Sequence, residues 1–210
     1  MRLVEIGLKE LERLVANAAD KSMDTFNLSV KAIEERKASE MKDEVKNRVI
    51  ELRKLREEID ELALEIIARY QPVAKDLRRV KASMELGYAF LRFGRYAYDA
   101  LAAFARVESI GAQCDAKYFR ELAPIVKQMM ENSIESIKKL DVIKAMKVIS
   151  KDDEVDELYH KFLSEIMKNY NSVPCAVVEA LSIKFLERAA DHSVHVASQA
   201  VFVVEGKYPE

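Results

Sequence analysis

The chain has 210 residues, with only five Gly and four Pro, far below the roughly 12% that these two types make up in an average protein. The glycines do not have the spacing of a phosphate-binding loop, and so few turn-forming residues argue against a β-sandwich or a β-barrel. The formal net charge of −2 comes from 34 basic and 36 acidic residues, so no general attraction to nucleic acid is expected.

Apolar residues recur at spacings of three and four along almost the whole chain, which predicts helices. Six helices are expected, near residues 4–36, 40–70, 73–108, 116–139, 142–169 and 174–205. Pro72 and Pro174 fit first-turn positions, and Asp141 and Ser172 fit helix caps. Long helices joined by short loops form antiparallel bundles, so the sequence predicts an all-α fold.

An internal repeat divides the chain into two parts. The Asp-Glu-Leu sequence at residues 60–62 recurs at residues 156–158, and Arg92 recurs at the same offset as Arg188. The repeat predicts two tandem antiparallel three-helix bundles related by a pseudo-twofold axis. We place the first bundle at residues 1–110 and the second at residues 111–210, meeting near Gly111.

The chain is expected to be soluble and cytoplasmic. No segment approaches the roughly 20 apolar residues of a membrane-spanning helix, and the first residues lack the pattern of a signal peptide. Cys114 and Cys175 are therefore expected to be free thiols in a reducing compartment.

Two acidic pairs stand out in the second repeat. Asp152 and Asp156 lie four residues apart, as do Glu187 and Asp191, and residues at this spacing share a helix face. If the two helices are neighbours, four carboxylates converge, and they repel one another unless a cation binds. Oxygen ligands suit Mg²⁺, Mn²⁺ or Ca²⁺, and iron accepts them. Such pairs also occur on solvated helix faces, so the spacing alone leaves both interpretations open.

The corresponding positions of the first repeat hold different residues. Arg56, Asp60, Leu91 and Arg95 stand where the second repeat has its four acids. We expect Arg56 and Arg95 to pair with Asp60, and we expect no metal there.

The histidines offer limited ligand chemistry. His192 is expected to pack at the edge of an apolar stripe, whereas His195 either packs or flanks a metal. Glu157 and His160 form one Glu-Xaa-Xaa-His motif, but a di-iron carboxylate bundle needs two.

A basic cluster follows Pro72. It consists of Lys75, Arg78, Arg79 and Lys81. It is interpreted either as a solvated face or as a docking patch for an acidic partner or phosphate.

Three ordered motifs resemble the PhoU family of phosphate-uptake regulators. Residues 69–78, RYQPVAKDLR, are similar to the family's RQQPVAxDLR segment. Residues 185–192, FLERAADH, are similar to its LERIGDHA segment, and residues 152–156 fit its E(D)xxxD pattern. The resemblance covers nearly the whole chain and implies the tandem bundle fold.

The resemblance also implies a metal cluster of iron, zinc, manganese or magnesium on the bundle surface. The positions carried over as ligands are Asp152, Asp156, Glu187 and Asp191. In the first repeat, Leu91 and Arg95 replace the family's Glu and Asp, so one metal site at most is expected, in the second repeat.

As a function, the resemblance implies a regulatory adaptor, not an enzyme, that exerts negative control over phosphate uptake. Its implied partners are the phosphate ABC transporter and a phosphate-sensing histidine kinase, and it would reach the membrane only through such partners. A homodimer is expected, with its seam on the apolar faces of the third and sixth helices. The alternatives are a metal-dependent bundle enzyme, a metal-storage protein, or a metal-free adaptor for another transporter.

Overall fold

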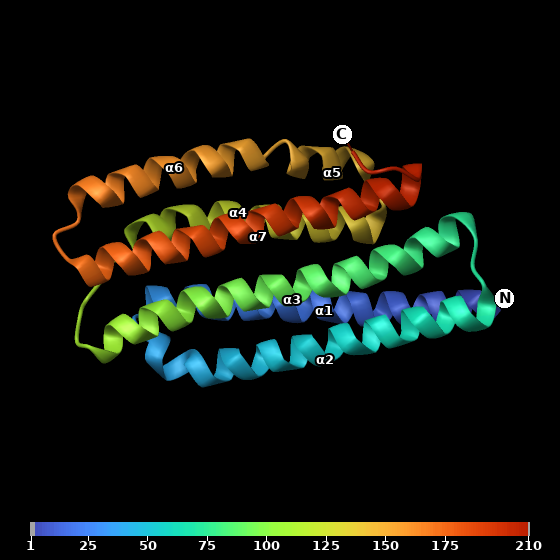
Figure 1. The fold of residues 1–210 in the computed structure, drawn as a ribbon, viewed down its shortest axis with the longest axis horizontal. Coiled ribbons are helices and arrows are strands. Elements are labelled where there is room, and N and C mark those ends of the chain that lie inside the picture. The colour runs from blue at the N-terminus through green and yellow to red at the C-terminus, as the bar shows by residue number, and fades with distance from the viewer. Residues whose placement is uncertain (1–2, 210) are drawn as a thin grey trace.

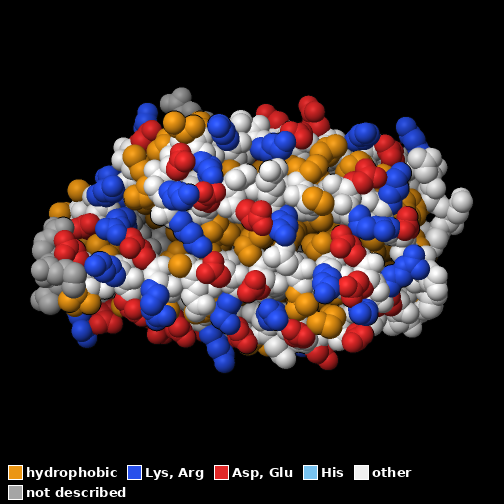
Figure 2. Space-filling model, turned by 180° about the vertical axis from the view of Figure 1, so that it is seen from behind, with side chains coloured by type: hydrophobic (Ala, Val, Ile, Leu, Met, Phe, Trp, Pro, Cys, Tyr) orange, Lys and Arg blue, Asp and Glu red, His pale blue; other side chains and the backbone are white. Residues whose placement is uncertain are grey.

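The computed structural model describes residues 3–209, which form seven α-helices and no strand. The helices are α1 (Leu3–Glu34), α2 (Ala38–Tyr70), α3 (Ala74–Ser109), α4 (Lys117–Lys139), α5 (Val142–Ile149), α6 (Asp152–Asn169) and α7 (Val173–Glu205). All of them run along the long axis of an elongated molecule (Figure 1). Seen from behind, charged side chains of both signs are interspersed over the surface (Figure 2).

The helices form two bundles that pack along α3 and α7. The first bundle is α1–α2–α3, and in the second α5 and α6 together take the place of one helix between α4 and α7 (Figure 1). This arrangement confirms the predicted all-α fold of two tandem three-helix bundles. Buried residues of α3 such as Phe90 and Phe93 and of α7 such as Leu186 and Val196 contribute to one continuous core. The apolar faces of α3 and α7 therefore meet inside the chain, although Tyr88 of α3 and Val177 and Leu181 of α7 stay exposed. The expected homodimer and its seam stay a prediction.

The predicted single helix at 142–169 is wrong, because it breaks between α5 and α6. At the end of α5, the Ser150 hydroxyl donates to the Lys147 carbonyl oxygen at 3.1 Å. Three acids, Asp152, Asp153 and Glu154, then fill the first turn of α6, where the helix dipole favours negative charge. The acids of this first turn favour a helix start here, although Lys151, the residue before α6, makes no side-chain capping bond.

Of the two expected caps, only one makes the capping bond. Asp141 precedes α5 and its carboxylate accepts from the Lys144 backbone N–H at 2.9 Å. Ser172 occupies the residue before α7, but its side chain makes no capping hydrogen bond.

In each bundle, a glutamate of the last helix caps the start of an earlier helix. Glu108 accepts from the backbone N–H groups of Ala38 (3.2 Å) and Ser39 (2.7 Å) at the start of α2. Glu179 of α7 accepts from the backbone N–H of Phe119 at 3.2 Å in the first turn of α4. Neither α2 nor α4 has a side-chain cap of its own, so these carboxylates satisfy orphan N–H groups and tie the helices together.

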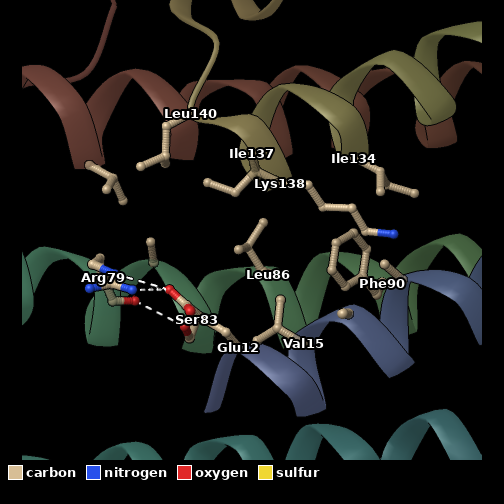
Figure 3. Close-up of a pocket in the computed structure, with 14 residues that line it drawn as sticks. Glu12, Val15, Arg79, Ser83, Leu86, Phe90, Ile134, Ile137, Lys138 and Leu140 are labelled. Atoms are coloured by element: carbon tan, nitrogen blue, oxygen red, sulfur yellow. Dashed lines mark hydrogen bonds and ion pairs between the residues drawn. The ribbon is translucent and has the colours of Figure 1, made fainter. Parts of the chain in front are cut away.

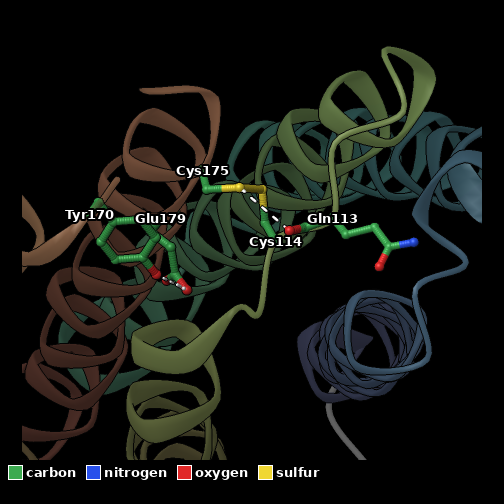
Figure 4. Close-up of a disulfide and its surroundings, with 5 residues drawn as sticks. All are labelled: Gln113, Cys114, Tyr170, Cys175 and Glu179. Carbon is green, nitrogen blue, oxygen red and sulfur yellow. Dashed lines mark hydrogen bonds between the residues drawn. A yellow bond between two sulfur atoms is a disulfide. The ribbon is translucent and has the colours of Figure 1, made fainter. Parts of the chain in front are cut away.

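Cys114 and Cys175 form a disulfide, with their Cα atoms 5.3 Å apart (Figure 4). The expectation of free thiols is therefore wrong. The bond joins the loop between α3 and α4 to the first turn of α7. Beside it, the Tyr170 hydroxyl donates to Glu179 Oε1 at 3.0 Å (Figure 4). Packing brings together two cysteines that are 61 residues apart in sequence.

Within residues 3–209, no helix is long and apolar enough to cross a membrane.

Candidate metal centre

Helices α6 and α7 bring three of the four predicted carboxylates together. One oxygen each from Asp156 of α6 and from Glu187 and Asp191 of α7 lie within 4.8 Å of one another. Glu187 is only 8% exposed, whereas Asp156 and Asp191 are half-buried. A set of oxygens this close can surround a single cation.

The fourth residue, Asp152, lies one turn before Asp156 and outside that group. Its pKa is nevertheless raised to about 6, first by burial and then by the negative charges of Asp191 and Asp156. Its Oδ1 atom is buried without a hydrogen-bond partner. Asp152 therefore lies at the edge of the cluster, close enough for the negative charges of the cluster to raise its pKa.

Two cations of α7 partly neutralise the cluster. Lys184 Nζ donates to Glu187 Oε1 at 2.6 Å, and Arg188 Nη1 donates to Asp191 Oδ2 at 3.2 Å. The other oxygen of Glu187, Oε2, is buried and makes no hydrogen bond, and Arg188 Nε lies 3.8 Å from it. Among the described residues, the cluster thus contains a buried oxygen that accepts no hydrogen bond from the protein.

The first repeat replaces these acids with an ion pair, as expected in part. Arg56 Nε lies 3.2 Å from Asp60 Oδ2, which matches half of the prediction. Arg95 pairs instead with Asp99, one turn further along α3, at 3.3 Å. Arg56 also lies over the Tyr88 ring, 5.7 Å from its centroid. In the first repeat, the positive charge beside Asp60 is therefore the guanidinium of Arg56.

The histidines of α7 lie beside the cluster, facing α3. His192 packs against Tyr96 of α3 and its Nδ1 atom lies 3.0 Å from the Arg188 carbonyl oxygen, so the packed role is the one the structure shows. Burial lowers the pKa of His192. His195 Nε2 lies 3.3 Å from Glu85 Oε2 of α3. The expectation that His195 could flank the metal has no support from this contact.

The basic cluster after Pro72 is largely engaged inside the chain. Arg79 pairs with Glu12 of α1, and Arg78 Nε donates to the Val203 carbonyl oxygen at 3.2 Å. Lys81 Nζ donates to the Tyr208 hydroxyl at 2.7 Å. These cations join α3 to α1 and to the C-terminal end of the chain, a role that the sequence did not indicate.

Comparison with known proteins places this fold in a family. The PhoU domain matches the chain twice, at residues 15–103 and 119–200. A phosphate-specific transport system accessory protein PhoU homolog of Clostridium acetobutylicum is 28% identical over 159 residues, which cover 73% of this chain and 72% of that protein. The homolog of Aquifex aeolicus is 29% identical over 205 residues, which cover 94% of this chain and 88% of that protein.

Solved structures agree on the fold. The crystal structure of PhoU from Pseudomonas aeruginosa superposes with a TM-score of 0.89 at 20% identity, covering 97% of this chain and 99% of that one. The phosphate transport system regulatory protein PhoU from Streptococcus pneumoniae gives 0.83 at 20% identity, covering 99% of each chain. Since the PhoU domain matches once in each bundle and spans most of the sequence, the chain belongs to the PhoU family.

Proposed function

We propose that this chain is a regulatory accessory protein of a phosphate transport system and that it exerts negative control over phosphate uptake. The observation that supports this role is the PhoU domain in both bundles, together with relatives named as phosphate-specific transport system accessory proteins. In this proposal the chain works in the cytoplasm as a homodimer and is not an enzyme. It binds the phosphate ABC transporter, a sensor histidine kinase, or both, and reaches the membrane only through them.

We also propose a metal site in the second repeat, held by Asp152, Asp156, Glu187 and Asp191. The convergence of three carboxylate oxygens within 4.8 Å supports it. So do the two buried oxygens without hydrogen-bond partners, Asp152 Oδ1 and Glu187 Oε2. The donors are all oxygen, which fits magnesium, manganese or iron better than zinc, whose structural sites favour nitrogen and sulfur.

A bound cation would supply the positive charge that lets these acids stay ionised in one place. Asp152 and Asp156 project from α6, and Glu187 and Asp191 from α7, so the four ligands would fasten α6 to α7. Lys184 and Arg188 already offset part of the negative charge, and they are positioned to hold the α7 carboxylates in place. The site in this proposal is structural and sets the shape of the second bundle.

Elemental analysis of the purified full chain tests the metal site. After growth with iron and manganese in excess, wild type is expected to retain metal, and Asp156→Ala and Asp191→Ala are expected to lose it. Glu154→Ala is the matched control, because Glu154 is an exposed acid on α6 that pairs with Lys151. Absence of metal from the wild type under these conditions would remove the site from the proposal.

The adaptor role is tested by co-purification. Tagged chain is expected to capture the ATPase subunit of the phosphate transporter or the sensor kinase, and not the ATPase subunit of an unrelated ABC transporter. Capture of neither partner from cells grown with abundant phosphate would refute the adaptor role. Repeating the capture with Asp191→Ala shows whether the metal site is needed for docking.

A further inference from the structure

A cavity of about 450 Å³ lies between the two bundles. Its walls are α1, α3 and the C-terminal end of α4, and Val203 of α7 closes one corner. Figure 3 shows Leu86 of α3 pointing into the gap between α4 and α1, with Ile137 facing it from α4. The volume falls within the range of small-molecule sites.

The cavity exists because small side chains line it where the bundles meet. Ala16 and Ala19 of α1 and Ala82 of α3 contribute only methyl groups. Helices α1 and α4 touch each other along a short stretch only, so neither fills the space. Among the remaining lining residues, Leu86 and Phe90 provide an apolar floor.

An ion pair lies at each end of the cavity. Arg79 and Glu12 lie at one end (Figure 3). Toward the other end, Lys138 of α4 reaches across to Asp20 of α1, with 2.9 Å between Nζ and Oδ1. Glu12 and Asp20 lie eight positions apart on α1, which corresponds to about 12 Å of helix. A partner helix, about 10 Å across, needs a longer groove with open ends, so the shape favours a compact apolar ligand.

The two ends differ in how readily they open. The Lys138 and Asp20 side chains are 44% and 69% exposed, and such surface pairs contribute little net stability. Arg79 is less exposed and lies near a second acid, Asp76, at 3.7 Å. Lys138 is therefore the cation that can exchange its carboxylate partner for one carried by a ligand.

We infer that this cavity binds an aliphatic carboxylate of medium chain length. Its hydrocarbon chain lies against Leu86, Phe90 and Ile137, and its carboxylate replaces that of Asp20 on Lys138. This site is separate from the carboxylate cluster and does not depend on the proposed phosphate function.

Calorimetric titration of the full chain with decanoate, below its micellar concentration, tests the inference. One saturable site is expected. Each methylene removed from the ligand is expected to weaken binding about fourfold, so hexanoate binds far more weakly. Ala16→Phe, which places a ring in the cavity, is expected to abolish binding, and Ala82→Met serves as a second variant should the first fail to fold.

The head group is tested separately. Lys138→Met is expected to weaken decanoate about threefold, the scale of an exposed ion pair, and to leave decanol, which has no carboxylate, unchanged. Lys127→Met is the matched control, because the Lys127 side chain of α4 is 43% exposed, close to the 44% of Lys138, and lies outside the cavity. Equal decanoate affinity in Lys138→Met and wild type would overturn the placement of the carboxylate.

Two other results overturn the site itself. One is the absence of saturable decanoate binding to folded wild type, and the other is wild-type binding by a folded Ala16→Phe variant. A third result assigns the cavity to another occupant. If wild type does not bind decanoate and Ala16→Phe abolishes capture of the transporter ATPase subunit, a side chain of a protein partner occupies the cavity, and the aliphatic carboxylate is excluded.

Discussion

Opening the disulfide between Cys114 and Cys175 is expected to destabilise the chain substantially. The bond closes a loop of 61 residues, and the loss of loop-closure entropy in the unfolded chain corresponds to about 4 kcal/mol at 25 °C. For a chain of this length, each kcal/mol shifts the melting temperature by roughly 2–4 °C. Reduction should therefore lower the melting temperature by roughly 8–16 °C.

Thermal unfolding followed by circular dichroism, with and without a phosphine reductant, measures this effect. The Cys114→Ala/Cys175→Ala double variant is the control, since it should melt near the reduced wild type and should not respond to reductant. Wild type that melts at the same temperature in both buffers, with two thiols titratable in denaturant before reduction, would refute the pairing. Equal melting with the bond shown to be intact beforehand would refute the entropic argument.

Three further results are expected. Glu179→Ala should lower the free energy of unfolding in urea by about 2–3 kcal/mol, because it leaves the Phe119 backbone N–H and the Tyr170 hydroxyl without their acceptor. Glu121→Ala, at an exposed position of α4, should change that free energy little. Glu108→Ala should cost about 1 kcal/mol, since it removes the carboxylate cap of α2. In metal-free protein kept in a chelator, the raised pKa of Asp152 means that the folded wild type loses stability as pH rises from about 4 through about 6. Asp152→Asn should therefore be more stable than wild type at pH 8, by about 1 kcal/mol after allowance for solvent screening, and equal to it at pH 4.

The helices were predictable because their signal is local. Apolar periodicity places α2 and α3 within two residues of their observed bounds, Ala38–Tyr70 and Ala74–Ser109. The repeat in the sequence adds the division into two bundles. The break at Ser150 was missed, since the apolar pattern continues across it and only the following acids mark a new start.

The sequence predicts which residues form the candidate site better than it predicts how their oxygens are arranged. A spacing of four places Asp152 with Asp156 and Glu187 with Asp191 on helix faces, which is a local property. The register of α6 against α7 decides which oxygens meet, and it excludes Asp152 from the group of three. Register depends on packing across the bundle, which a spacing rule does not contain.

Contacts between distant residues escaped prediction altogether. The disulfide and the Glu179 cap join residues about 60 positions apart, and nothing in the flanking sequence marks either pair. The Glu108 cap spans about 70 positions. Each depends on how whole helices are placed, so it emerges only from the three-dimensional fold.

The break before α6 has a consequence for local opening. Helix α6 buries only Val155, Phe162 and Ile166 among its 18 residues, whereas α4 buries ten of its 23. A helix held by so few apolar contacts opens at a lower free energy than the rest of the fold. Its backbone amides are therefore expected to exchange with solvent sooner than those of α7. Because α6 carries two of the four carboxylates, a cation bridging to α7 would slow that exchange, so the protection of α6 amides would report occupancy of the site.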